Sequence, residues 1–417
     1  MQKSVLITNY EIATYSGSEI NAATIAKRMK ELGYKVYIVA LDFSSPLYDD
    51  VKDSFDECIN LMKNDFDFSN IEFDYIWAHH FSILDWLIFE KGVKAKKIIY
   101  SSLSGKEYLE APPIYANELN VVLANSPETQ AQLIQEGVKN SQLFENYSFL
   151  EYFNRDIKIT QLKNIAIVSN HVPQELNEAV PMLRERGYNV EIYGIEGKQE
   201  LITDKVLEKY DAIITIGKTV QYSMSLKIPV YIYDRFGGPG YLRINNIEKN
   251  RAHNFSGRGY DKKTKEELCE DIINGFEDVL TELEEIKQYA FENFCFEKKI
   301  DKLIQQLEEK PIVNLQEIRN KNQKYARNLM ASKNLVIYVQ RKMERIKEKE
   351  KDQVAYEYLE VQKRKLSEKD EIIEGYKKRM EELAENNTEK EKELKNIKNS
   401  KTWKFIGKVR RIISKIR

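Results

Sequence analysis

Short apolar runs and amphipathic stretches alternate from the N-terminus to about residue 308, and this alternation limits the fold more than any other feature. Residues 4–8 form an apolar run, residues 18–32 have apolar side chains at helical spacing, and residues 36–41 form a second apolar run after Gly33. A strand, a helix and a second strand in this order make a βαβ unit with parallel strands. Parallel sheets are covered by helices on both faces, so we predict an α/β protein.

The alternation comes in two sets, separated by a polar join near residues 155–163. We predict two Rossmann-like domains, one over 1–158 and one over 159–310. The loops at the carboxyl ends of their strands should converge on a cleft between the domains. The further predicted strands are 73–78, 97–101, 120–124, 165–169, 190–193, 212–216 and 230–233, and the further helices include 83–90, 126–136 and 174–186.

Composition narrows the classes of protein that fit. A chain of 417 residues has room for two domains and an extension. Its three cysteines lack CxxC spacing, which argues against a disulfide framework or a zinc site. No N-terminal signal peptide and no run of 18 apolar residues is present, so we expect a cytoplasmic chain. The 25 tyrosines are not interleaved with basic residues, which argues against nucleic-acid binding.

The stretch 229–259 combines an apolar run with closely spaced glycines and basic residues. The glycines are predicted to form a tight turn into a following helix, where free backbone N–H groups would bind a phosphate or diphosphate. Arginines in the stretch would add charge-assisted hydrogen bonds. The alternative is a Gly-Pro loop that serves chain geometry only. The residues concerned are Gly237, Gly238 and Gly240 around Pro239, with Arg235, Arg243 and Arg258.

The stretch SKTWKFIGKVRR at 400–411 resembles the ends of bacterial cell-surface polysaccharide glycosyltransferases. Four further segments resemble GT-B glycosyltransferases, in particular bacterial enzymes similar to glycosyltransferase family four. They are PVYIYDRFGGPGY at 229–241, SGSE at 16–19, ANSPET at 124–129, and YAFENFCFEKKIDKLIQQLEE at 289–309. The resemblance implies a GT-B fold, with an N-terminal acceptor domain over 1–158, a C-terminal donor-binding domain over 159–310, and helices that cross back to the first domain. It also implies sugar transfer from a nucleotide-diphosphate sugar, without a metal ion and without a further cofactor, onto a glycan or lipid-linked acceptor.

The chain departs from this family at the helix before residue 229. Family four enzymes usually carry two glutamates there, the second of which binds the donor ribose, whereas no acidic residue lies between Gly217 and Val230. Lys218 is our candidate for a replacement contact to the donor, and a solvated lysine is the alternative. The departure keeps open a catalytically inactive GT-B scaffold that serves as partner subunit of another glycosyltransferase. A sugar-nucleotide epimerase of the same fold is a third hypothesis.

Candidate site residues follow from their places after predicted strands. The imidazoles of His79 and His80 are candidates for a general base or for polarising an acceptor hydroxyl, with a structural histidine as the alternative. Gly17, Glu19 and Glu107 are the acceptor-side candidates. The donor-binding candidates are Asn170, His171, Lys218, Arg235, Gly237, Gly238, Gly240 and Arg258.

The segment 311–400 is rich in Lys and Glu and is predicted to be a helical, coiled-coil extension. Apolar residues recur at intervals of seven, with one asparagine in the series, and a second series follows the companion spacing. We expect self-association through this segment, with a single helix packed on the other domains as the alternative. The two series are Leu366, Ile373, Met380, Asn387 and Leu394, and Tyr376, Leu383 and Ile397.

The last segment, 401–417, holds seven Lys/Arg and no Asp/Glu, so that 58 basic and 66 acidic residues remain in the rest of the chain. Its apolar residues fall on one helical face, a pattern typical of helices that lie on anionic membranes. The alternative is a helix packed against its own domains. Together these features predict an oligomeric glycosyltransferase peripheral to the inner face of the cell membrane, with several tails acting at once.

Overall fold

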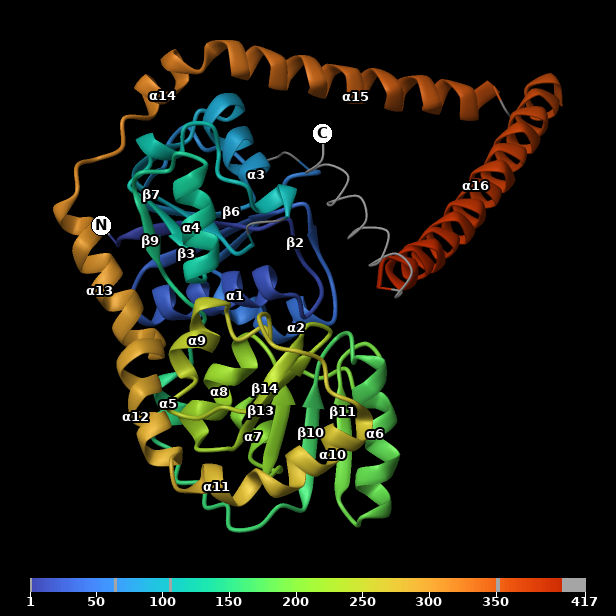
Figure 1. The fold of residues 1–417 in the computed structure, drawn as a ribbon. Coiled ribbons are helices and arrows are strands. Elements are labelled where there is room, and N and C mark those ends of the chain that lie inside the picture. Colours follow the sequence, from blue (N-terminus) through green and yellow to red (C-terminus); the bar gives the residue numbers. More distant parts are fainter. Residues whose placement is uncertain (1, 64–65, 105–106, 350–352, 400–417) are drawn as a thin grey trace, which may run out of the picture. The chain divides into compact units, whose positions relative to one another are not determined.

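A computed structural model of the chain describes residues 2–63, 66–104, 107–349 and 353–399. Its contacts divide the chain into two compact units, Met1–Ala326 and Arg327–Arg417. The first unit contains a seven-stranded sheet and a five-stranded sheet (Figure 1). The α/β class predicted from the sequence is confirmed.

The first sheet has the strand order β5-β3-β1-β6-β7-β8-β9, and all of its pairs are parallel. Its central strands are buried on both faces, which explains their continuous apolar sequences. The strands are β1 (Ser4–Thr8), β3 (Lys35–Ala40), β5 (Glu57–Asn60), β6 (Glu72–His79), β7 (Lys94–Ser102), β8 (Val121–Ala124) and β9 (Ser141–Leu143). A small separate pair joins β2 (Glu11–Ile12) to β4 (Asp42–Phe43).

The helices between these strands include α1 after β1 and α4 after β8. Their bounds are α1 (Gly17–Glu31), α2 (Leu47–Val51), α3 (Phe81–Asp85), a π-helical turn η2 (Trp86–Glu90), α4 (Pro127–Gln135) and α5 (Leu150–Phe153). Short 3₁₀ turns are η1 (Lys52–Ser54), η3 (Tyr108–Glu110) and η4 (Ala116–Glu118). Ser126 caps α4 through its side-chain oxygen, and Pro127 occupies the first turn, as expected for a helix start.

The second sheet has the order β11-β10-β12-β13-β14, with four parallel strands and one antiparallel edge strand. The strands are β10 (Asn164–Val168), β11 (Asn189–Tyr193), β12 (Ala212–Thr215), β13 (Val230–Asp234) and β14 (Gly237–Tyr241). Its helices are α6 (Gln174–Glu185), α7 (Asp204–Leu207), α8 (Lys218–Leu226), α9 (Ile247–Ala252), α10 (Lys265–Asn274) and α11 (Phe276–Leu280).

The predicted glycine turn into a helix is wrong. Residues Gly237–Tyr241 form β14, which turns back along β13 as a hairpin. A proline inside the strand is tolerated because β14 lies at the edge of the sheet, where its nitrogen needs no partner strand. The backbone that we expected to open a helix is therefore paired in the sheet.

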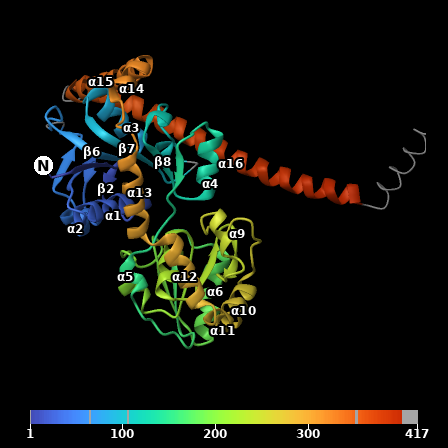
Figure 2. The ribbon, with the colours of Figure 1, turned by 90° about the vertical axis from the view of Figure 1, so that its left-hand side faces the viewer.

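Two helices carry the chain from the second domain back to the first, as the resemblance implied (Figure 2). They are α12 (Leu283–Phe294), which packs against α8, and α13 (Phe296–Glu309). The apolar face of α13 joins the core of the first domain together with Trp77 and Tyr147. Arg28 on α1 binds Asp301 on α13 at 2.8 Å.

Compact packing on the first domain continues to Ala326. Arg319 of α14 (Leu315–Lys321) donates to the carbonyls of Ile88 and Val93 at 2.9 and 2.7 Å. At the start of α15 (Gln323–Lys349), the Tyr325 hydroxyl donates to the buried Asp85 carboxylate.

The described residues of the second unit are helical and consist of the rest of α15 and of α16 (Gln353–Asn399). The side chains of Leu366 and Ile373 are exposed by 64% and 50%. The coiled coil itself stays a prediction, and the side chains of the other predicted contact positions in α16 lie outside the described residues. So does the predicted membrane tail, 401–417.

Candidate active site

His79 and His80 lie at the carboxyl end of β6, next to the end of β1. The two rings have different surroundings. His79 is buried, with its Nδ1 3.0 Å from the Thr8 carbonyl oxygen and its Nε2 3.0 Å from Nδ2 of Asn21. Because a carbonyl can only accept, Nδ1 carries the proton and Nε2 accepts from Asn21. Burial lowers the pKa of His79 to about 3, so this ring is neutral and both of its nitrogens are bonded within the protein.

His80 is held in a backbone conformation that side chains rarely adopt, with φ 64°. Its Nδ1 accepts the backbone N–H of Tyr10 at 3.0 Å, and the Tyr10 ring meets the imidazole edge-on. The neutral ring therefore carries its proton on Nε2. Burial lowers the pKa of His80 to about 4, which opposes a charged imidazolium. A strained, neutral imidazole with a hydrogen-bond donor at Nε2 is suited to bind an oxygen atom and poorly suited to remove a proton.

Glu19 shapes the loop before α1. Its carboxylate accepts the backbone N–H groups of Ala13 and Thr14 at 2.5 and 2.8 Å, and the hydroxyls of Thr14 and Ser16 at 2.8 and 2.7 Å. Four accepted hydrogen bonds explain how a buried carboxylate is tolerated here. The predicted acceptor-side residue Gly17 begins α1 and is exposed.

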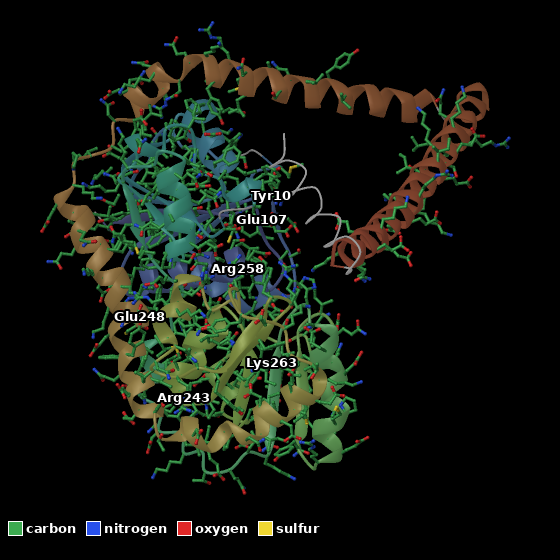
Figure 3. The ribbon with its side chains drawn as sticks, viewed as in Figure 1. Tyr10, Glu107, Arg243, Glu248, Arg258 and Lys263 are labelled. Carbon is green, nitrogen blue, oxygen red and sulfur yellow. The ribbon has the colours of Figure 1, made fainter. Side chains whose placement is uncertain are left out.

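The loop after β7 contains the predicted acceptor-side residue Glu107, which is exposed (Figure 3). Its neighbour Glu110 is the more constrained carboxylate, since it accepts the backbone N–H of Leu103 at 2.6 Å. Burial raises the pKa of Glu110 to about 7, and the charge of Glu107 acts in the same direction.

Lys218 begins α8 in the second domain, but its ammonium does not lie in solvent. Lys218 Nζ is 4.6, 5.5 and 6.0 Å from the ring centroids of Tyr147, Tyr222 and Phe149. It is buried and has no hydrogen-bond partner among the described residues. Burial lowers the pKa of Lys218 to about 7. A buried cation without an anionic partner, at the positive end of a helix, is the arrangement expected of an anion-binding site.

Helix α8, which would carry the two glutamates of the family, has no other acidic residue in their place. Gln221 is buried, and its amide nitrogen, oriented to donate, lies 2.7 and 3.1 Å from the carbonyls of Gly217 and Lys218. Tyr222 is also buried, next to the Lys218 ammonium. These two positions, nearest to the expected ribose-binding glutamate, face the protein interior.

Arg235 and Arg258 meet at the tip of the β13–β14 hairpin. Their guanidinium carbons lie 4.8 and 5.5 Å from the ring centroid of Phe236. Arg258 also binds Glu128, at the start of α4 in the first domain, at 2.7 Å (Figure 3). The ion pair of Arg258 with Glu128 thus joins the second domain to the first, next to Arg235.

The hairpin glycines are required for close backbone packing. A Cβ on Gly238 would lie 1.9 Å from the Ile232 carbonyl oxygen, and one on Gly237 would lie 2.4 Å from that of Asp261. Gly240 has a φ of 90° and no room beside the Asp271 carboxylate. A contact of these glycines with a donor stays a prediction.

Asn170 and His171 are exposed on the loop after β10. Burial raises the pKa of Asp234, and the charges of Arg235 and His171 oppose this rise. Arg243 lies apart from Arg258 (Figure 3). Because β14 runs antiparallel to β13, Arg243 follows its end away from the hairpin tip, and the guanidinium binds Glu282.

No protein-family model and no curated protein matches the chain. Among solved structures, that of TarM is 11% identical, covers 74% of this chain and 99% of its own, and has a TM-score of 0.50. The chain has the GT-B fold. A point mutant of TarM from S. aureus, in complex with fondaparinux, α-GlcNAc-glycerol and UDP, is 14% identical with a TM-score of 0.39, over 56% of this chain and 55% of that one. UDP-GlcNAc 2-epimerase from Neisseria meningitidis, bound to UDP-GlcNAc, is 13% identical with a TM-score of 0.44, over 74% and 100%.

Several residues at the boundary of the GT-B domains were missed from the sequence. Glu145 binds Arg251 through both carboxylate oxygens, at 2.7 and 2.9 Å, and Lys299 lies 3.9 Å away. Tyr147 and Asn21 connect Lys218 with His79. No sequence motif marks these residues, because their roles depend on contacts between segments that are far apart in the chain.

Two cavities of about 660 and 700 Å³ lie elsewhere in the second domain. The first is beside the edge strand β11, and the second is between β14 and α10, against Gly238 and Pro239. Within the described ranges, no group of three His, Cys, Asp or Glu side chains could hold a metal ion, and no helix is long and apolar enough to cross a bilayer.

Proposed function

We propose that the chain is a glycosyltransferase that moves a sugar from a nucleoside-diphosphate sugar to a cell-surface polysaccharide or lipid-linked glycan precursor. The observation that carries the proposal is the unpartnered Lys218 ammonium at the start of α8 in a GT-B fold. Transfer requires stabilisation of the leaving diphosphate as charge develops. Lys218 and the N-terminus of α8 would supply this, with Arg235 and Arg258 at the hairpin tip.

On the acceptor side, the Nε2–H group of His80 would donate a hydrogen bond to the acceptor hydroxyl or to another oxygen atom of the acceptor sugar. His80 Nε2 already carries the ring proton and its Nδ1 accepts the Tyr10 N–H, so neither nitrogen of the buried ring is free to take up a proton. The proposed role is therefore to orient the acceptor by a donated hydrogen bond rather than to serve as general base.

His80→Ala is expected to lower kcat about 100-fold, because the oriented donor is lost. His80→Gln keeps an N–H donor close to the place of Nε2 and should lose only about 10-fold. Release of the nucleoside diphosphate from a panel of sugar nucleotides, with a membrane extract as acceptor, measures both. A glutamine variant as inactive as the alanine variant would contradict the donor role.

The inactive scaffold is the second candidate, because the positions next to Lys218 that would hold the ribose face the interior. Transfer by the purified chain excludes it. The scaffold hypothesis would be supported if the purified chain bound a partner enzyme, transferred no sugar and bound no nucleotide.

We also propose that the chain self-associates through α16 and binds anionic membranes through 401–417 on the cytoplasmic face. Exposed Leu366 and Ile373 support the first part, since a partner helix would cover them. The basic, acid-free composition of 401–417 supports the second. The family-four assignment, a metal-independent reaction and the absence of a further cofactor belong to the same proposal.

A further inference from the structure

The five-residue segment 145–149, which follows β9, contacts the second domain at every residue. Besides the Glu145 pair with Arg251, Asn146 binds Asn254 at 3.0 Å and Ser148 binds Ser225 at 2.6 Å. The Phe149 ring lies 5.7 Å from that of Tyr222. We call residues 145–149 the boundary segment. Its central residue, Tyr147, also contacts Asn21, which binds His79, the neighbour of His80.

Tyr147 uses its ring and its hydroxyl for different partners. The ring stacks on Phe296, with centroids 4.2 Å apart, and lies against the Lys218 ammonium. The hydroxyl donates to Oδ1 of Asn21 on α1 at 2.6 Å. One buried side chain therefore contacts the anion site of the second domain and the first helix of the first domain.

The hydrogen bonds beyond Tyr147 have a fixed direction. The Thr8 carbonyl requires a proton on His79 Nδ1, so His79 Nε2 must accept from Asn21 Nδ2. The amide oxygen of Asn21 is then left to accept from the Tyr147 hydroxyl. The backbone of His79 is also fixed, since its N–H and its carbonyl both bond to the Thr8 hydroxyl at 3.1 and 2.9 Å. Every side chain in this series is buried.

We propose that Tyr147 is a positioning residue that couples occupancy of the anion site at Lys218 to the position of His79 and of its neighbour His80. The inference rests on the proposed function, which takes a diphosphate as the anion and His80 as the acceptor-side group. An anion at the start of α8 draws the ammonium away from the Tyr147 ring. The ring and its hydroxyl then settle differently against Asn21, and the change reaches His79 through one amide.

Tyr147→Phe tests this role because it keeps the ring against Lys218 and Phe296 and removes only the hydroxyl. We expect the nucleotide that binds wild type, out of UDP, ADP and GDP, to bind Tyr147→Phe with an affinity within about 2-fold of that for wild type, while kcat falls about 10-fold, the effect of one lost buried hydrogen bond. Asn21→Ala should give the same loss, and the double variant should lose no more than either single variant. Wild-type kcat in Tyr147→Phe, or losses that multiply in the double variant, would overturn the proposal.

Tyr241→Phe is the matched control. The Tyr241 hydroxyl is buried and donates to the Ile272 carbonyl at 2.8 Å, in the core of the second domain and at the end of β14 away from the hairpin tip. It should cost similar stability and leave kcat unchanged. If Tyr241→Phe lowers kcat as much as Tyr147→Phe, the effect is one of general stability and the proposal is wrong.

A second readout needs no reaction. In protein labelled with ¹⁵N-histidine, whichever of UDP, ADP and GDP binds wild type should shift the signals of the His79 ring nitrogens in wild type and not in Tyr147→Phe. The Lys218→Met substitution should also shift these signals when Tyr147 is present, and not when it is combined with Tyr147→Phe. If none of the three nucleotides binds wild type, the proposed function fails, whereas the Lys218→Met comparison still tests the coupling. Equal shifts with and without the Tyr147 hydroxyl would refute the coupling, and Asn21→Ala gives the same comparison if Tyr147→Phe does not fold.

Discussion

Lys218→Met is expected to stabilise the folded protein by about 2 to 4 kcal/mol at pH 7, while it removes the side chain proposed to bind the donor diphosphate. The reason is the unpartnered ammonium among Tyr147, Phe149 and Tyr222. Methionine fills a similar volume among these rings without a charge to desolvate. A substitution that stabilises the fold and impairs binding is typical of a functional site.

The stabilisation should depend on pH. The pKa of Lys218 is about 7 in the folded protein and 10.5 for an ordinary lysine, so between these values the unfolded chain binds more protons. The contribution of Lys218 to the free energy of unfolding of the wild type should therefore rise as the pH is raised from 7 to 10. The difference between Lys218→Met and wild type should shrink over the same interval. Taking the difference removes the contribution of Lys299, whose pKa burial lowers to about 8.

Urea unfolding at pH 7.5 and pH 9.5 measures both effects. Lys227→Met is the control, because Lys227 ends the same helix, is partly exposed, and binds Glu284 at 2.8 Å. We expect it to change the free energy of unfolding by less than about 1 kcal/mol at both pH values. Destabilisation by Lys218→Met, or a difference independent of pH, would contradict the account of a desolvated ammonium.

Gly238→Ala is expected to destabilise the second domain by about 3 kcal/mol or more. The added Cβ would lie 1.9 Å from the Ile232 carbonyl oxygen and 2.8 Å from the Tyr233 Cα, both backbone atoms of β13. Backbone cannot rotate away as a side chain can, so the hairpin would have to open. Arg235 and Arg258, which meet at its tip, would lose their common position.

Gly17→Ala is the control for Gly238→Ala, since a Cβ on Gly17 meets nothing within 4 Å. Its free energy of unfolding should stay within about 0.5 kcal/mol of wild type. Urea unfolding, followed together with limited proteolysis after the hairpin, measures the two variants. Equal stability of Gly238→Ala and Gly17→Ala would show that the hairpin is not packed as described.

The sequence predicted the two sheets well because buried parallel strands leave continuous apolar runs between amphipathic helices. It failed at β14, since a glycine run is compatible both with a turn into a helix and with an edge strand in close contact with its neighbour. The contact of Gly257 with the Gly237 carbonyl oxygen, where a Cβ would lie at 2.2 Å, belongs to this close packing. The pattern of apolar residues carries no information about such contacts.

The candidate site was predicted in part. The end of β6 located His79 and His80, but adjacent histidines at a strand end do not reveal which ring is enclosed. That depends on Asn21 and Tyr10, which come from other segments. Lys218 was expected near a diphosphate, whereas its enclosure by aromatic rings depends on Tyr147 and Phe149, which are remote in the chain.

The most direct test of the central claim is calorimetric titration of the full-length chain with UDP, ADP and GDP. We expect one of them to bind wild type in the micromolar range, about 100-fold more weakly to Lys218→Met, and equally well to Lys227→Met. Because these nucleoside diphosphates carry no sugar, the titration measures binding at the donor site separately from transfer. Failure of all three nucleotides to bind wild type, or equal affinity for Lys218→Met, would contradict a donor site at the start of α8.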